Sequence, residues 1–195
     1  MEKQLQFDEK MIARNFFAIN DFSKAENGNF KVSGLLSVFD SEEDNMNGYV
    51  YHAGCYNDFC KNYFEKNMKN IPLDILHNTM DIYHLAGKVT EFAVTNSEAR
   101  IVAEVSRFTP LFENIVGLIE DEVLQGFSDM SFVNDGYFDG TKNLFHVKQC
   151  SIFSVTLTQN PAVAKSQLKA MNATKFNFEN IKTETEEKKS TFFGL

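Results

Sequence analysis

The sequence predicts an α+β fold that is mainly β, with about seven strands and two helices. Short runs of β-branched and aromatic residues recur along the chain, and polar turn segments separate them. Only two stretches place apolar residues at the helical spacing of three and four positions. Strands and helices do not alternate, which argues against the parallel α/β class. A chain of 195 residues with 43% hydrophobic residues is sufficient for one domain with its own core.

The first half of the chain is predicted to form three strands and one helix. Residues 30–39 alternate loosely between apolar and polar side chains, as a half-buried strand does, and an acidic loop follows them. A second strand covers 49–54 and ends at a glycine. Apolar residues then recur at helical spacing over 55–67. The short apolar segment 71–78 is a third strand or strand end, with His77 near its terminus.

The second half is predicted to contain a hairpin, a helix and two further strands. Two β-rich runs flank a polar turn over 87–108, which indicates a hairpin. One apolar stripe runs along 109–126, and Gly126 is the expected C-cap of this helix. Residues 127–135 and 144–157 are β segments linked through an Asp-Gly turn.

The chain divides into three parts by composition. An N-terminal segment, 1–29, precedes the predicted folded domain, 30–164. The remaining residues, 165–195, are polar and charged, with too few apolar side chains to build a second core. We therefore expect a flexible tail after the domain.

Charge and cysteine content exclude several classes of function. The net charge is −8 and no basic cluster is visible, so the sequence predicts no nucleic-acid partner. No apolar run approaches the roughly 20 residues that span a bilayer, and the first ten residues lack the apolar core of a signal peptide. Cys55, Cys60 and Cys150 have neither paired spacing nor an even count, which argues against disulfides or a zinc site. We expect a cytosolic protein without a cofactor or metal.

Histidine is the side chain best suited to act as a base near neutral pH, and the chain has only four. They are His52, His77, His84 and His146. A lone histidine in a strand is more often a structural residue that makes one hydrogen bond than a catalyst. The residues alone therefore leave the base unassigned.

Four strings occur in a fixed order along the chain: FKVSGLLSVFDSEEDNMNGYVYHAGCY, IPLDILHNTMDIYHLAGKV, LIEDEVLQGFSDMSF and QCSIFSVTLTQNPA. Together they resemble the prohead proteases of tailed bacteriophages over most of the domain. Each string alone has low specificity, whereas four in order with similar spacing are fairly specific. The matching positions are Gly34, Phe39, Gly48, Val50, Gly54, Tyr56, Leu73, Leu76, His77, Asn78, Gly87, Lys88, Gly126, Phe127, Ser128, Gln159, Asn160, Pro161 and Ala162.

The resemblance implies a fold like that of herpesvirus assemblin, an orthogonally packed seven-stranded β-barrel surrounded by helices. It also implies that Ser128 is the nucleophile of a serine peptidase and that His77 is its general base. The function implied is that of a serine endopeptidase of phage head maturation. Such an enzyme cleaves scaffold and capsid-protein extensions, and itself, inside the procapsid.

Two departures from the family pattern leave alternatives open. The string after Ser128 is one residue longer than usual, so Ser131 is a second candidate nucleophile. The last strand carries no carboxylate to orient the base, so its His146 or Gln149 is the candidate third residue. We favour His146, because assemblins use a second histidine. Asp81, four residues after His77, is another candidate for orienting it.

The resemblance also implies partners and a location. The partners are the phage major capsid protein and the scaffold protein, and a homodimer is plausible by similarity to assemblins. The location is the host cytoplasm, within the phage procapsid. The alternative, favoured by the missing carboxylate, is a non-catalytic structural or scaffold protein of the phage head that retains the protease barrel.

Overall fold

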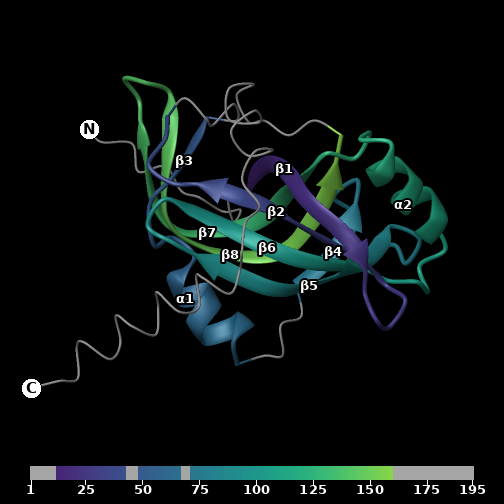
Figure 1. Ribbon diagram of the computed structural model, residues 1–195. Coiled ribbons are helices and arrows are strands. Elements are labelled where there is room, and N and C mark those ends of the chain that lie inside the picture. Colours follow the sequence, from purple (N-terminus) through teal and green to yellow (C-terminus); the bar gives the residue numbers. More distant parts are fainter. Residues whose placement is uncertain (1–11, 43–47, 67–70, 160–195) are drawn as a thin grey trace, which may run out of the picture.

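The computed structural model describes residues 12–42, 48–66 and 71–159, and these residues form one mixed sheet with few helices (Figure 1). The prediction of a mainly β fold of the α+β type is confirmed. The strands are β1 (Ile12–Lys24), β2 (Phe30–Val38), β3 (Tyr49–Tyr51), β4 (Ile71–Ile75), β5 (Leu85–Val94), β6 (Glu98–Val105), β7 (Gly126–Asp139) and β8 (Leu144–Thr158). The helices are α1 (Asn57–Phe59), the π-helical η1 (Cys60–Phe64) and α2 (Phe112–Glu120).

The eight strands follow the order β3-β8-β4-β5-β6-β2-β1-β7, and β7 also pairs with β8. Pairings therefore lead from β8 through β4, β5, β6, β2, β1 and β7 back to β8. The strands β3 and β4 both run parallel to β8, and all other pairs are antiparallel. Figure 1 shows the β7–β8 hairpin projecting beside β3.

The strand β1 is the element that the sequence did not predict. It lies within the segment 1–29 that we placed before the domain, yet it pairs with β2 and with β7. The sheet therefore begins at Ile12, well ahead of Phe30. The predicted tail, 165–195, lies outside the described residues.

One face of the sheet carries the hydrophobic core. It is rich in aromatic rings, such as Tyr56, whose ring centroid lies 5.9 Å from that of Phe39 and 5.7 Å from that of Phe92. Burial of such large apolar surfaces is the main favourable term in folding. Phe127, Leu73, Val155 and Leu157 belong to the same core.

The two predicted helices are present but shorter than expected. Within 55–67, α1 passes directly into η1, and within 109–126, α2 ends at Glu120. Gly126 was predicted as the C-cap, and this is wrong because it is the first residue of β7. Glu122 instead adopts a left-handed conformation (φ 57°) beyond the helix end. The next residue, Val123, donates its N–H to Leu118 O.

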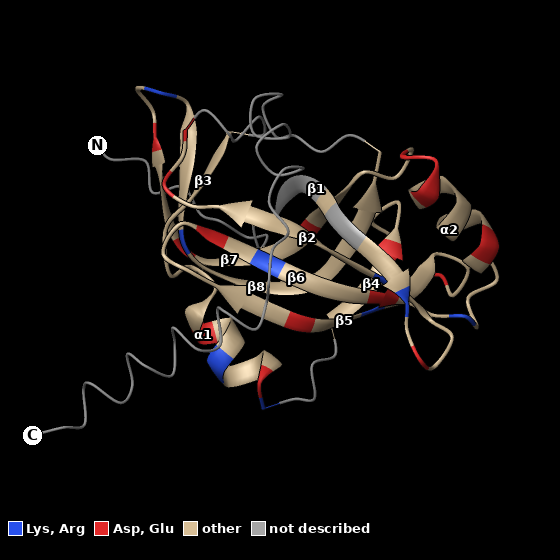
Figure 2. Ribbon diagram, viewed as in Figure 1, with Lys and Arg blue, Asp and Glu red and all other residues tan. Residues whose placement is uncertain are grey.

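Charged residues are spread over the elements (Figure 2). The helix α2 carries Glu113 and Glu120 and no basic residue. No helix within the described ranges is both long and apolar enough to cross a membrane.

Candidate active site

A row of three polar side chains crosses neighbouring strands on the face opposite the core. Asp74 of β4 is the register partner of Thr156 in β8, and Thr156 is the partner of Ser128 in β7. Leu73, Phe127, Val155 and Leu157 are adjacent to these residues along the strands and belong to the core, and successive side chains of a strand alternate between faces. Asp74 and Ser128 are fully buried, and Thr156 is nearly so.

His77 contacts this row from the turn that follows β4. Its Nδ1 lies 3.0 Å from Thr156 Oγ1, and Thr156 Oγ1 donates to Asp74 Oδ1 at 2.5 Å. Leu76 and His77 both adopt left-handed conformations, with φ of 63° and 54°. These angles are uncommon outside glycine, and they turn the chain so that the imidazole lies against β8.

Asp74 holds a carboxyl group in a buried strand. Burial raises the pKa of this carboxyl above its ordinary value. The hydroxyl groups of Thr156 and Ser154 and the backbone N–H groups of Asn78 and His77 oppose that rise in pKa, because they favour the charged form. The carboxyl group is thus linked both to the hydroxyl in β8 and to the turn that carries His77.

Ser128 lies on the other side of Thr156 from Asp74. Residues directly opposite each other in an antiparallel pair have Cβ atoms about 5 Å apart, so both Ser128 and His77 are neighbours of one threonine side chain. Among the described residues, Ser128 Oγ has no hydrogen-bond partner, so no hydrogen bond joins it to His77. Catalytic hydrogen bonds of unliganded sites often form only when substrate binds.

Ser131, the other candidate nucleophile, is placed on the opposite face of β7. Its hydroxyl donates to the Asp129 carboxylate, and Tyr56 Oη lies 3.5 Å from the same group. Burial, and then the charge of Asp129, raise the pKa of Tyr56 well above its ordinary value. Ser131 therefore faces the core side, while Ser128 shares the face of Thr156.

His146 lies far from His77. It precedes Thr156 by ten positions in β8, which is roughly 30 Å along an extended strand. Its ring stacks on Tyr137 at 4.6 Å, and its Nδ1 lies 3.0 Å from His52 Nε2. The structure does not bring His146, the predicted third catalytic residue, to His77.

The remaining candidates for orienting His77 also have other partners. Gln149 Nε2 donates to Oδ2 of Asp58, a residue of α1, at 2.5 Å. Asp81 Oδ2 lies 2.9 Å from His84 Nδ1, and the pKa of Asp81 is lowered mainly by the backbone N–H of Tyr83. Neither residue contacts His77 in the interactions that the described residues make.

Comparison with solved structures finds a phage protein of similar fold. It is the capsid assembly protease gp21 of bacteriophage T4, with a TM-score of 0.61 and 11% sequence identity. The match covers 76% of this chain and 98% of the phage protein. The chain has the fold of a phage capsid assembly protease. No protein-family model and no curated protein matches the sequence.

A likeness at 11% identity establishes the fold and leaves the chemistry to the residues of this chain. On this fold, the polar row and His77 lie together at one end of β8. Within the described ranges, no group of three or more His, Cys, Asp or Glu side chains could hold a metal ion. The arrangement offers a hydroxyl, an imidazole and a carboxyl group, which are the components of nucleophilic catalysis.

Two residues at the site were missed by sequence reasoning, Asp74 and Thr156. Asp74 left a signal, because a charged residue in the middle of the apolar segment 71–75 needs a partner if it is buried. Thr156 left none, because only the register of β8 against β4 and β7 brings it to the histidine.

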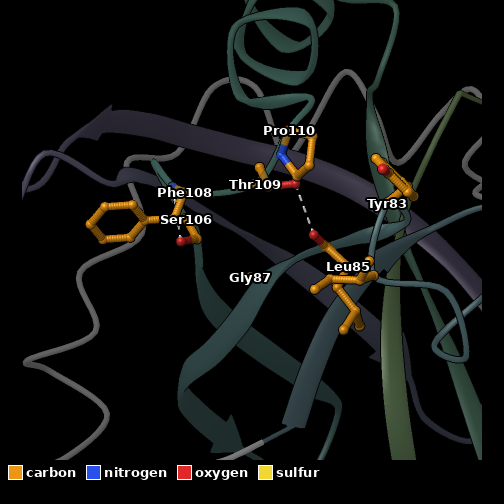
Figure 3. A pocket seen from close by; sticks show the side chains of 8 residues that line it. Tyr83, Leu85, Gly87, Ser106, Phe108, Thr109 and Pro110 are labelled. Carbon is orange, nitrogen blue, oxygen red and sulfur yellow. Dashed lines mark hydrogen bonds between the residues drawn. The ribbon is translucent and has the colours of Figure 1, made fainter.

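A pocket of about 420 Å³ lies beside the site (Figure 3). Residues of β5 and of the segment between β6 and α2 form part of its lining. Leu85, which lines it, is the register partner of Asp74. Thr109 Oγ1 closes one wall by donating to Leu85 O at 2.9 Å. None of the predicted catalytic residues lines this pocket.

Proposed function

We propose that this chain is a serine endopeptidase of phage head maturation, with Ser128 as nucleophile and His77 as general base. One observation carries the proposal: His77 contacts the threonine that lies directly opposite Ser128, on a fold shared with a phage capsid assembly protease. Its substrates are the scaffold protein, the extensions of the major capsid protein and its own chain. Its place of action is the procapsid in the host cytoplasm.

The proposed reaction proceeds by acyl transfer. Ser128 Oγ attacks the carbonyl carbon of the scissile peptide while His77 Nε2 accepts its proton. The C–N bond then breaks, and the protonated imidazole returns the proton to the leaving amine. Water then attacks the carbonyl carbon of the resulting ester while His77 Nε2 accepts its proton, and the imidazole returns this proton to Ser128 Oγ as the ester bond breaks.

The finer architecture belongs to the same proposal. The pairings that lead from β8 around to β7 and back to β8 support a closed, orthogonally packed seven-stranded barrel of the assemblin type, with β3 as an appended strand. A homodimer is the expected assembly by similarity to assemblins.

The experiment that tests the proposal is the co-expression of the full chain with its phage scaffold and capsid proteins, followed by intact mass measurement. Wild type should shorten these proteins and its own C-terminal part, and Ser128→Ala should abolish every cleavage. The matched control is Ser131→Ala, a change of the same size three residues along β7, which should leave cleavage intact. Cleavage that persists in Ser128→Ala but stops in Ser131→Ala would reverse the assignment.

The second candidate function is a non-catalytic structural protein of the phage head. The observation in its favour is that Ser128 is fully buried and that its Oγ has no hydrogen-bond partner in the part of the chain that the structure describes. A serine-directed fluorophosphonate separates the two candidates. Labelling that requires both Ser128 and His77 supports the peptidase, whereas an unlabelled wild-type chain that also leaves the scaffold uncut supports the structural protein.

A further inference from the structure

With Asp74 ionised, the contacts of Thr156 permit one arrangement of protons. A hydroxyl group has one proton, and a carboxylate can only accept hydrogen bonds. Thr156 donates that proton to Asp74 Oδ1 at 2.5 Å, so its oxygen offers only a lone pair to His77 Nδ1 at 3.0 Å. His77 Nδ1 must therefore carry a hydrogen, and the lone pair of the neutral ring is on Nε2.

We propose that Thr156, held by Asp74, is the positioning residue that fixes the tautomer of His77 and links its ring to a negative charge. The role of Thr156 in catalysis rests on the proposed function, because a general base needs its lone pair on the nitrogen that faces the nucleophile. Asp74 acts on His77 through Thr156 in this arrangement.

The surroundings leave Thr156 little freedom to make other contacts. Asp74 is fully buried, Thr156 is 2% exposed, and the two residues are register partners on adjacent strands. A charge in such a water-poor setting acts more strongly on an imidazolium than it would in solution.

The inference also accounts for a departure seen in the sequence. β8 contains no carboxylate that could orient the base. In this chain the carboxyl group comes from the parallel neighbour β4, three residues before the histidine that it serves, and the hydroxyl of β8 connects the two. The site thus keeps a negatively charged group, which lies on β4 and not on β8.

The tautomer is measurable directly by ¹⁵N NMR of the histidine rings in the full chain. We expect the wild-type His77 ring, once neutral, to show a protonated Nδ1 and an unprotonated Nε2. Thr156→Val keeps the shape and removes the hydroxyl, so the ring should lose this preference. Thr158→Val is the matched control on the same strand and face, and it should leave the His77 signals unchanged.

Activity gives the second readout. The kcat/KM for a peptide spanning a mapped cleavage site should fall about 100-fold in Thr156→Val, and Thr156→Ser should recover it to within about tenfold of wild type. A wild-type His77 protonated on Nε2, or identical ring spectra for wild type and Thr156→Val, would overturn the inference. If wild type cuts nothing, the proposed function fails, and the ring spectra still decide the role of Thr156.

Discussion

The two ends of β8 hold similar side chains in different settings. At its C-terminal end, Thr156 connects His77 to Asp74 and lies opposite Ser128. At its N-terminal end, His146 is hydrogen-bonded to His52, and the opposite residue in β7 is the aromatic Tyr137.

The difference shows what turns a histidine into a candidate base. At the N-terminal end, His52 also has its carboxylate, because its Nδ1 lies 2.6 Å from Asp40 Oδ1. That end nevertheless lacks a serine across the ladder, and its rings are stacked: those of Tyr137 and His146 are 4.6 Å apart and nearly parallel. A histidine beside an aspartate is thus insufficient to make a candidate active site. The residue on the neighbouring strand must also carry a group, such as the serine hydroxyl, that can act as a nucleophile.

The largest expected effect is a difference in kcat/KM between variants of His77 and His146. His77→Ala should lower kcat/KM by about 10⁴-fold or more, because the nucleophile loses its base. His146→Ala removes a stacked ring far from the site and should change kcat/KM by less than about threefold. Steady-state kinetics on one peptide substrate compares both variants. A large loss in His146→Ala would show that the two ends are coupled.

The next largest effect is a difference in unfolding free energy between variants of two glycines, Gly87 and Gly136. At Gly87 an added Cβ would lie 1.9 Å from Glu104 O, and at Gly136 it would lie 2.4 Å from His146 O. Gly87 pairs with Leu73 and Val105 inside the sheet, whereas Gly136 lies toward the projecting end of the β7–β8 hairpin. Gly87→Ala should cost about 3 kcal/mol of unfolding free energy and Gly136→Ala about 1 kcal/mol.

Urea denaturation measures both glycine variants. Gly87→Ala should also disturb the His77 ring signals, because β5 supports β4 and hence Asp74. Equal losses of stability in the two variants, with unchanged ring signals in both, would contradict the view that the interior of the sheet positions the site.

The smallest expected effect is the pH dependence of stability that Asp74 contributes. Burial raises the pKa of its carboxyl above 3.8, the ordinary value, so the folded state binds this proton more tightly than the unfolded state does. Stability due to this group is then present at pH below 3.8 and is lost as pH rises through the folded pKa. The unfolding free energy of wild type minus that of Asp74→Asn should therefore decrease as pH rises from about 4. Denaturation curves from pH 4 to 8 check this, and a difference that increases with pH would show the opposite sign.

Much of the strand content followed from local pattern. The runs around Phe30–Val38, Glu98–Val105 and Leu144–Thr158 show the alternation or β-rich composition that a strand requires. The missed strand β1 depends on its pairing with β2 and β7, since its own residues have no such clear signal. The helix end was missed for a similar reason, because Gly126 pairs with Thr158 across the sheet and does not cap a helix.

By itself the sequence determined the mainly β class and the position of both helices, and its resemblance to the prohead proteases supplied His77 and Ser128 as residues to test. Only the tertiary structure decided which side chains accompany them. Strand register brings Asp74, Thr156 and Ser128 into one row, and it carries Ser131 to the other face and His146 to the far end of β8. The physical reason is that cross-strand neighbours are fixed by hydrogen-bond register between segments distant in sequence, which no local pattern records.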